Sequence, residues 1–290
     1  MTARASGPKP DRFPGAARSV IAWPLALVVV LLTVAALPAS VSAQRYLLQL
    51  RPRVGDTLRM ELEERREHTG TTKLGSTDSS RTMSTHLRMY SRAVVEGQLR
   101  GAVTVLAIID SVSFISTDQH ARAVAAGQRM LFRLGEDGTM RVVGEETAAN
   151  RRASEVVALM PAALPRQPVA VGDTWARSIP MVVARSAEEG VVRASFRLDS
   201  VSRDENFAYI SMRGDLKRDS VPAGPPRGTR MQVSGTVTGE LLLDRRRGWL
   251  TQSRFGVMLH TTMLPGAPAG AHPVRFQTRI TQRMRTLDRK

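Results

Sequence analysis

The sequence contains no cysteine. This absence excludes disulfide frameworks, thiolate metal sites, thiol nucleophiles and a lipidated N-terminal cysteine. Aromatic residues make up only 4% of the chain, and the net charge is +16. Lysine occurs only at Lys9, Lys73, Lys217 and Lys290, so almost all of the positive charge is arginine. A chain of 290 residues that is 42% hydrophobic is nevertheless long enough for one large domain or two small ones.

The arginines are spread along the whole chain rather than collected in one segment. A nucleic-acid-binding protein gathers its basic residues in one patch and adds aromatic rings that stack on bases, so the sequence predicts no nucleic-acid partner. Two interpretations of the excess charge stay open. A genome that prefers arginine codons explains it without any function. Attraction to anionic lipid headgroups or cell-surface polyanions would make it functional.

Residues 1–43 have the organisation of a secretory signal peptide. A basic segment precedes the apolar run Val20–Leu37, and small side chains at Val41 and Ala43 occupy the positions that signal peptidase recognises. This pattern predicts cleavage before Gln44 and a periplasmic or secreted protein. The alternative is an uncleaved anchor in the inner membrane, because the apolar residues 20–37 are just long enough to span a bilayer.

Alternation of apolar and polar residues predicts half-buried antiparallel strands over much of the chain. The segment 274–285 shows it most clearly, since one side is largely apolar and the other is mostly arginine. The segments 83–90 and 192–199 have the same pattern. Glycine-containing turns at 135–138 and 245–248 separate further apolar runs and predict hairpins.

The sequence pattern predicts one principal helix. In Thr147–Met160 the apolar residues recur at spacings of three and four, and prolines follow the segment. A second, short helix is predicted at 119–126. The segment 60–67 fits a helix or a strand by its pattern alone.

The tetrapeptide Val-Gly-Asp-Thr occurs twice, at 54–57 and 171–174, and is followed each time by strand runs and a hairpin. We interpret this as a weak repeat of two antiparallel β lobes, which makes the segment 60–67 a strand. The alternative is one sheet with a recurring turn. We predict that Gly172 and Asp173 of the second copy form a structural turn, with the glycine at positive φ and the aspartate bonding an N–H group two residues on.

The predicted fold is therefore mainly β, with antiparallel curved sheets in two related lobes and one principal helix. The predicted domains are a signal peptide at 1–43, a first β lobe at 44–148, a helix and proline-rich linker at 149–168, and a second β lobe at 169–290.

The linker and the second copy of the tetrapeptide together carry a recognisable motif. Leu164-Pro165 precedes Pro168-Val169, and Val171-Gly172-Asp173-Thr174-Trp175 follows. This motif resembles that of a family of exported bacterial β-rich proteins of unknown function. The resemblance implies strands on both sides of one helix, and it implies no activity. The chain is also similar, by architecture alone, to the periplasmic lipoprotein carriers, whose curved antiparallel sheets hold acyl chains; a fold does not establish a function.

The sequence lacks the common catalytic and metal-binding motifs. It has no nucleophile elbow, phosphate-binding loop or dinucleotide fingerprint. The histidines lie too far apart for a local metal site, at positions His68, His86, His120, His260 and His272. The acidic residues between 199 and 219 fall on a predicted turn and a predicted loop. We therefore expect no catalytic residue, no metal and no cofactor; the alternative is a hydrolase whose site is assembled from residues distant in sequence.

The sequence thus predicts a non-catalytic exported envelope protein that binds an apolar or amphiphilic ligand, such as a lipid, or an envelope partner protein. The candidate ligand-binding residues are Trp175, Phe196, Trp249 and Phe255. As large apolar side chains in strand patterns they would equally serve to fill the core.

A row of basic residues lies along one side of the terminal strand pattern and consists of Arg275, Arg279, Arg283 and Arg285. We expect this row to guard an edge strand against aggregation, because the last strand of a chain often lies at an edge. The alternative is a surface for peripheral contact with an anionic membrane.

Overall fold

The computed structural model describes residues 44–74, 77–99, 101–117, 126–143, 164–182, 189–222, 230–264 and 272–287. By its internal contacts, Gln44–Lys290 forms one compact unit. The predicted signal peptide and principal helix lie outside the described residues, as does the short helix except for Ala126, which is part of a turn. No helix among the described residues is long and apolar enough to cross a membrane.

Strands account for most of the described chain. They are β1 (Arg45–Tyr46), β2 (Thr57–Leu74), β3 (Thr77–Leu99), β4 (Ala102–Ser116), β5 (Arg129–Gly135), β6 (Met140–Val143), β7 (Val169–Ala170), β8 (Thr174–Val182), β9 (Glu189–Val201), β10 (Phe207–Pro222), β11 (Arg230–Asp244), β12 (Trp249–Leu264) and β13 (Val274–Leu287). The strands predicted from alternation are confirmed, including the ambiguous segment 60–67, and so are both predicted hairpins.

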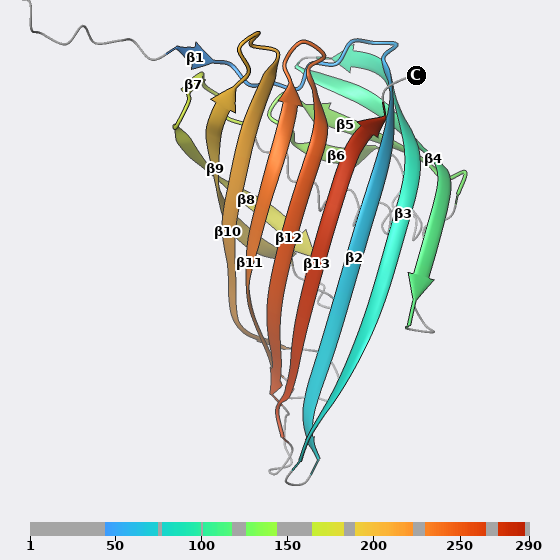
Figure 1. Cartoon of the computed structure of the whole chain (residues 1–290), viewed down its shortest axis with the longest axis vertical. Helices are drawn as coiled ribbons and strands as arrows, with labels where there is room; N and C mark the ends of the chain where they lie inside the picture. Colours follow the sequence, from blue (N-terminus) through green and yellow to red (C-terminus); the bar gives the residue numbers. More distant parts are fainter. Residues whose placement is uncertain are drawn as a thin grey trace, which may run out of the picture. The chain divides into compact units, whose positions relative to one another are not determined.

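Eleven of these strands form a single antiparallel sheet in the order β6-β5-β4-β3-β2-β13-β12-β11-β10-β9-β8, while β1 pairs only with β7. The sheet is strongly curved, and its two ends turn to the same side of the central strands (Figure 1). The strands of the two predicted lobes join through the pairing of β13 with β2, so they are two halves of one sheet. A repeat relationship between the halves stays a prediction.

The two Val-Gly-Asp-Thr turns have the same hydrogen bonds and the same backbone conformation. The glycine φ angles are 91° at Gly55 and 93° at Gly172, and the positive φ at Gly172 was predicted. The glycine N–H groups donate from Gly55 to the Val95 carbonyl (2.8 Å) and from Gly172 to the Leu198 carbonyl (2.7 Å). The aspartate carboxylates accept from N–H groups three residues earlier, from Arg53 to Asp56 (2.8 Å) and from Ala170 to Asp173 (2.9 Å). The prediction of a bond two residues on was wrong, because each carboxylate folds back over its turn.

The substitution Gly172→Val tests this structural role. A Cβ atom at Gly172 would have no atom within 4 Å, so the cost comes from the positive φ alone. We expect the free energy of unfolding to fall by about 1 to 3 kcal/mol, measured by urea denaturation. Gly97→Val is the matched control, because that glycine also has open space and lies outside the positive-φ region. Equal free energies of unfolding for the two variants would contradict the prediction.

The inner side of the curved sheet carries the hydrophobic core. Phe196 and Leu198 of one half are fully buried, as are Val95 and Val105 of the other, and all four belong to one cluster. Along β13 the buried residues alternate with exposed ones, as a strand with one solvated face requires. We call the solvated side of the large sheet its outer face.

One end of the sheet is crossed by residues 44–53, which we call the strap. Leu48 and Leu50 of the strap are 0% and 4% exposed and belong to the core cluster. The Leu50 N–H donates to the Glu136 carbonyl (2.8 Å), and the Arg51 N–H donates to the Gly248 carbonyl (2.9 Å). The strap therefore ties the β5–β6 turn to the β11–β12 turn, which belong to different halves of the sheet.

The terminal strand is not an edge strand, and the prediction that it guards a sheet edge was wrong. β13 lies at the middle of the sheet, between β12 and β2. Its outer face places arginines directly opposite glutamates of β2, in the pairs Arg279–Glu67, Arg283–Glu63 and Arg285–Glu61. Opposite charges at facing positions favour this pairing. The predicted loop around residues 215–219 was also wrong, because β10 continues through it.

Candidate functional site

A groove of about 1020 Å³ crosses the outer face of the sheet. Residues of seven strands line it, from β10 through β11, β12, β13, β2 and β3 to β4. Its charged and titratable lining residues are Glu63, Arg65, His86, Arg213, Glu240, Arg254 and Arg283. We call it the face groove.

Small side chains form the floor of the face groove. Thr238 lies opposite Gly256, and Gly256 lies opposite Thr281, so three neighbouring strands carry little side-chain bulk at one level. The same row continues to Arg213 on one side and to Arg65 on the other. The groove is therefore a depression between arginines, and its floor offers hydroxyl groups.

Two arginines face each other beside this floor. Arg254 of β12 lies directly opposite Arg283 of β13, an arrangement that like charges normally disfavour. Their other neighbours in register are Glu240 and Glu63. Within the described part of the chain, Arg213, Arg254 and Arg283 make no ion pair within 4.0 Å.

The carboxylates of β2 beside the groove bind other partners instead. Glu63 Oε1 lies 2.9 Å from His86 Nε2, within hydrogen-bond distance. Glu61, on the next row, is 5% exposed and accepts from Arg285 Nε (2.6 Å) and the Tyr90 hydroxyl (3.2 Å), with Arg88 at 3.3 Å. These contacts leave the groove with an excess of positive charge.

Burial raises the pKa of Glu61, but the hydrogen bond and charge of Arg285, with smaller contributions from Tyr90 and Arg88, outweigh it. The pKa of Glu61 therefore lies below its ordinary value. A carboxylate with a lowered pKa in the folded state stabilises the fold above its unfolded pKa and loses that contribution as the pH falls. This network thus holds the outer faces of β13, β2 and β3 together at neutral pH.

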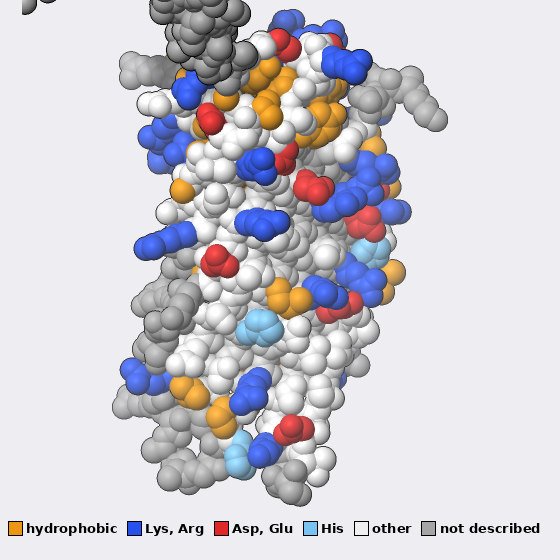
Figure 2. Space-filling model, turned by 60° about the vertical axis from the view of Figure 1, so that its left-hand side comes forward, with side chains coloured by type: hydrophobic (Ala, Val, Ile, Leu, Met, Phe, Trp, Pro, Cys, Tyr) orange, Lys and Arg blue, Asp and Glu red, His pale blue; other side chains and the backbone are white. Residues whose placement is uncertain are grey.

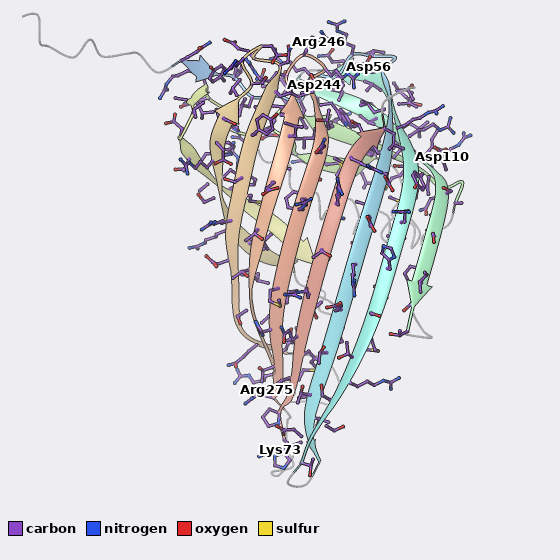
Figure 3. The ribbon with its side chains drawn as sticks, viewed as in Figure 1. Asp56, Lys73, Asp110, Asp244, Arg246 and Arg275 are labelled. Carbon is purple, nitrogen blue, oxygen red and sulfur yellow. The ribbon has the colours of Figure 1, made fainter. Side chains whose placement is uncertain are left out.

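The sequence-predicted residues fall into two places. Of the basic row, Arg283 lines the face groove, whereas Arg275 lies at the far end of the long strands (Figure 3). Arg279 and Arg285 lie on the same outer face. Along β13, Arg279 lies between Arg275 and Arg283, and Arg285 lies beyond Arg283. The row therefore does not act as one unit in the groove.

The four aromatic candidates belong mainly to the core. Phe196, Trp249 and Phe255 are 0%, 7% and 3% exposed, and Trp175 packs half-buried against Phe196, with ring centroids 5.8 Å apart. Only Phe255 also borders the groove, from beneath its floor. Their role as ligand-binding residues stays a prediction.

Sequence reasoning missed Arg213 and Arg254. Each lies on the polar side of an alternating segment, which is the only local signal available. Their proximity to Arg283 depends on strand register. Among the described residues, no group of three or more side chains of the kinds that bind metals comes together.

Comparison with known proteins gives a family without an assigned function. Residues 156–250 match the model of a family of unknown function (DUF6263). The matched segment contains the motif of residues 164–175. No curated protein matches the sequence.

Among solved structures, the chain is similar to lipovitellin, in a structure described as showing lipid–protein interactions. The two share 7% sequence identity, with a TM-score of 0.44 over 82% of this chain and 26% of the lipovitellin chain. This chain therefore spans about a quarter of lipovitellin's length.

Proposed function

We propose that this protein is an exported, non-catalytic binding protein whose face groove holds an anionic saccharide chain of the cell envelope. The facing pair Arg254 and Arg283, without a carboxylate within ion-pair distance in the described chain, is the observation that carries this proposal. Guanidinium groups bind carboxylates and phosphates through paired, charge-assisted hydrogen bonds. A bound anion would also remove the repulsion between the two arginines.

The extent of the groove favours a chain over a single small ion. Seven adjacent strands border the groove, and six strand spacings correspond to ~29 Å. Arg213 lies toward one end, and Arg65 lies beyond the central pair, where it pairs with Glu67 (3.0 Å). The arginines without an ion pair in the described chain therefore extend from Arg213 to Arg283. A ligand with several regularly spaced anionic groups would match this arrangement.

The chemistry of the lining favours recognition by charge and hydrogen bonds. Hydroxyl groups come from Ser84, Thr117, Ser211, Thr238 and Thr281. No tryptophan or tyrosine is among the described lining residues, and Phe255 is only 3% exposed, so a sugar finds no exposed phenyl, phenol or indole ring to stack on. An uncharged saccharide would therefore gain little binding free energy in the face groove. The sequence-based proposal of an apolar ligand stays a prediction.

A binding experiment with three probes tests the proposal. The probes are polygalacturonate as a carboxylated saccharide, dextran as a neutral saccharide and polyphosphate as an anion without sugar. We expect the wild-type protein to bind polygalacturonate more tightly than polyphosphate, to ignore dextran, and to lose affinity as salt rises. The triple variant R213Q/R254Q/R283Q should bind polygalacturonate at least about 30-fold more weakly, since each lost charge-assisted bond is worth about 1.5 kcal/mol or more.

The matched control is R53Q/R203Q/R246Q, which removes the same charge from exposed arginines outside the groove. This variant should retain nearly all of its affinity for polygalacturonate. Equal losses of affinity for polygalacturonate in both triple variants would show that only net charge matters. That result would reject the face groove as the binding site. Preference for polyphosphate would reject the saccharide.

A further inference from the structure

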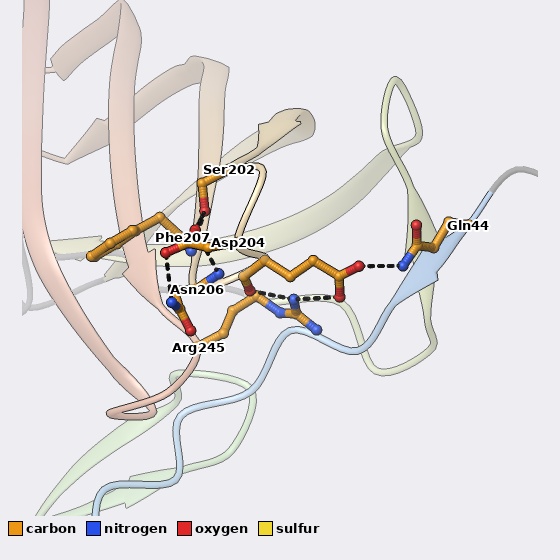
Figure 4. Close-up of polar contacts among 7 residues, drawn as sticks. Gln44, Ser202, Asp204, Asn206, Phe207 and Arg245 are labelled. Atoms are coloured by element: carbon orange, nitrogen blue, oxygen red, sulfur yellow. Dashed lines mark hydrogen bonds and ion pairs between the residues drawn. The ribbon is translucent and has the colours of Figure 1, made fainter.

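The end of the sheet that the strap crosses is built from several turns held together by the strap. β1 of the strap pairs with β7, next to the second Val-Gly-Asp-Thr turn. Gln44 Nε2 donates to Glu205 Oε1 (2.6 Å), and Glu205 also contacts Arg245 (Figure 4). The Arg245 guanidinium lies over the Tyr46 ring, 5.0 Å from its centroid. Asp56, Asp244 and Arg246 lie at this end, opposite the end with Lys73 and Arg275 (Figure 3). We call it the capped end.

Apolar side chains project into solvent at the capped end. Val54 and Val171, the first residues of the two equivalent turns, are 55% and 50% exposed. Leu47 of the strap is 42% exposed, and Leu99, the last residue of β3, is 61% exposed. Figure 2 shows hydrophobic side chains gathered toward this end, with basic and acidic side chains around them. The turns require their glycine and aspartate, but nothing in their hydrogen bonding requires an exposed valine.

Seven acidic side chains of the capped end accept a hydrogen bond or form an ion pair at this end, as Asp56 with the Arg53 N–H, Glu136 with Arg51, Asp137 with Thr139, Asp173 with the Ala170 N–H, Asp204 with Asn206, Glu205 with Gln44 and Asp244 with the Arg247 N–H. Glu96, beside the first turn, is exposed and forms no ion pair within 4.0 Å among the described residues.

Three arginines of the same end have no such partner. Arg53, Arg203 and Arg246 are exposed and form no ion pair within 4.0 Å among the residues that the structure describes. They lie in the strap, in the β9–β10 turn and in the β11–β12 turn. Three arginines without an ion-pair partner in the described chain thus lie at the same end as the exposed valines.

We propose that the capped end docks on an anionic lipid bilayer. Val54, Val171 and their apolar neighbours enter the interfacial region, and Arg53, Arg203 and Arg246 contact the anionic headgroups. Exposed apolar side chains beside unpaired arginines suit this surface, because a bilayer interface offers apolar contact just beneath negative charge. This contact is independent of the face groove.

Co-sedimentation with lipid vesicles tests the proposal. The protein is purified after export, and its intact mass establishes its N-terminus. We expect it to bind vesicles of phosphatidylcholine with 30% phosphatidylglycerol, and to bind pure phosphatidylcholine at least about tenfold more weakly. R53Q/R203Q/R246Q should bind the anionic vesicles at least about 20-fold more weakly than wild type. V54S/V171S should bind them at least about fivefold more weakly.

Two matched controls distinguish docking by the capped end from nonspecific binding to vesicles. R213Q/R254Q/R283Q removes the same charge from the face groove, and I115S removes an apolar side chain that is 67% exposed elsewhere. Both should bind the anionic vesicles within about twofold of wild type. The proposal is overturned if wild type does not bind these vesicles, if V54S/V171S binds like wild type, or if the groove variant loses as much as the capped-end variant. Because R53Q/R203Q/R246Q should still bind polygalacturonate, failure here and failure of the groove are told apart.

Discussion

Leu48→Ala is expected to lower the free energy of unfolding by about 2 to 5 kcal/mol. Leu48 is 0% exposed and lies in the strap, within the cluster that joins the cores of both sheet halves. Truncation removes buried apolar surface and leaves a cavity that the surrounding strands cannot close, because their hydrogen bonds hold them in place. The effect should be large, since the strap connects turns of the two halves.

Leu47→Ala is the control for this measurement. Leu47 is the adjacent residue of the strap and is 42% exposed, so the same truncation should cost less than about 1 kcal/mol. Urea denaturation followed by tryptophan fluorescence measures both variants, with Trp175 and Trp249 as reporters in the described core. Similar losses for the two leucines would contradict the prediction that the burial of Leu48 sets the size of its loss.

Gly248→Ala is the second substitution expected to have a large effect, with a loss of about 3 kcal/mol or more. Gly248 has a φ of 62°, where an L-residue costs about 1 to 2 kcal/mol. A Cβ atom there would lie 2.6 Å from the Arg51 carbonyl carbon and oxygen, which belong to the strap backbone. The strap would have to move, and the hydrogen bond from the Arg51 N–H to the Gly248 carbonyl would weaken.

Gly127→Ala isolates the contribution of this contact. Gly127 also has a positive φ, 79°, but a Cβ atom there would have no atom within 4 Å. Its variant should therefore show only the conformational cost of about 1 to 2 kcal/mol. The double variant L48A/G248A should lose less than the sum of the single variants, because both displace the same strap. Equal effects at Gly248 and Gly127 would rule out a steric role for the strap.

The strands and turns could be predicted from the sequence because their signals are local. Alternation over a few residues reports which side of a strand is buried, and this placed β3, β9 and β13 correctly. The Val-Gly-Asp-Thr motif predicted a positive φ at Gly172, because only glycine adopts that conformation without steric cost, and Gly55 of the first copy has the same conformation.

The place of each strand in the sheet could not be predicted in the same way. The terminal strand pairs with β2, a partner about two hundred residues away in sequence, and alternation is the same for a central and an edge strand. The edge prediction therefore failed. The complementary charges of Arg285 and Glu61 become visible as a pair only once this register is known.

By itself, the sequence determined an antiparallel β protein with a solvated, arginine-rich face, because side-chain burial in a strand follows from its own two-residue period. Only the tertiary structure decided that Arg213, Arg254 and Arg283 line one groove, and that Val54 and Val171 lie at one end beside the strap. These sites combine residues from distant strands and turns. The pairing register and the curvature of the whole sheet bring them together, and neither is encoded in any single segment.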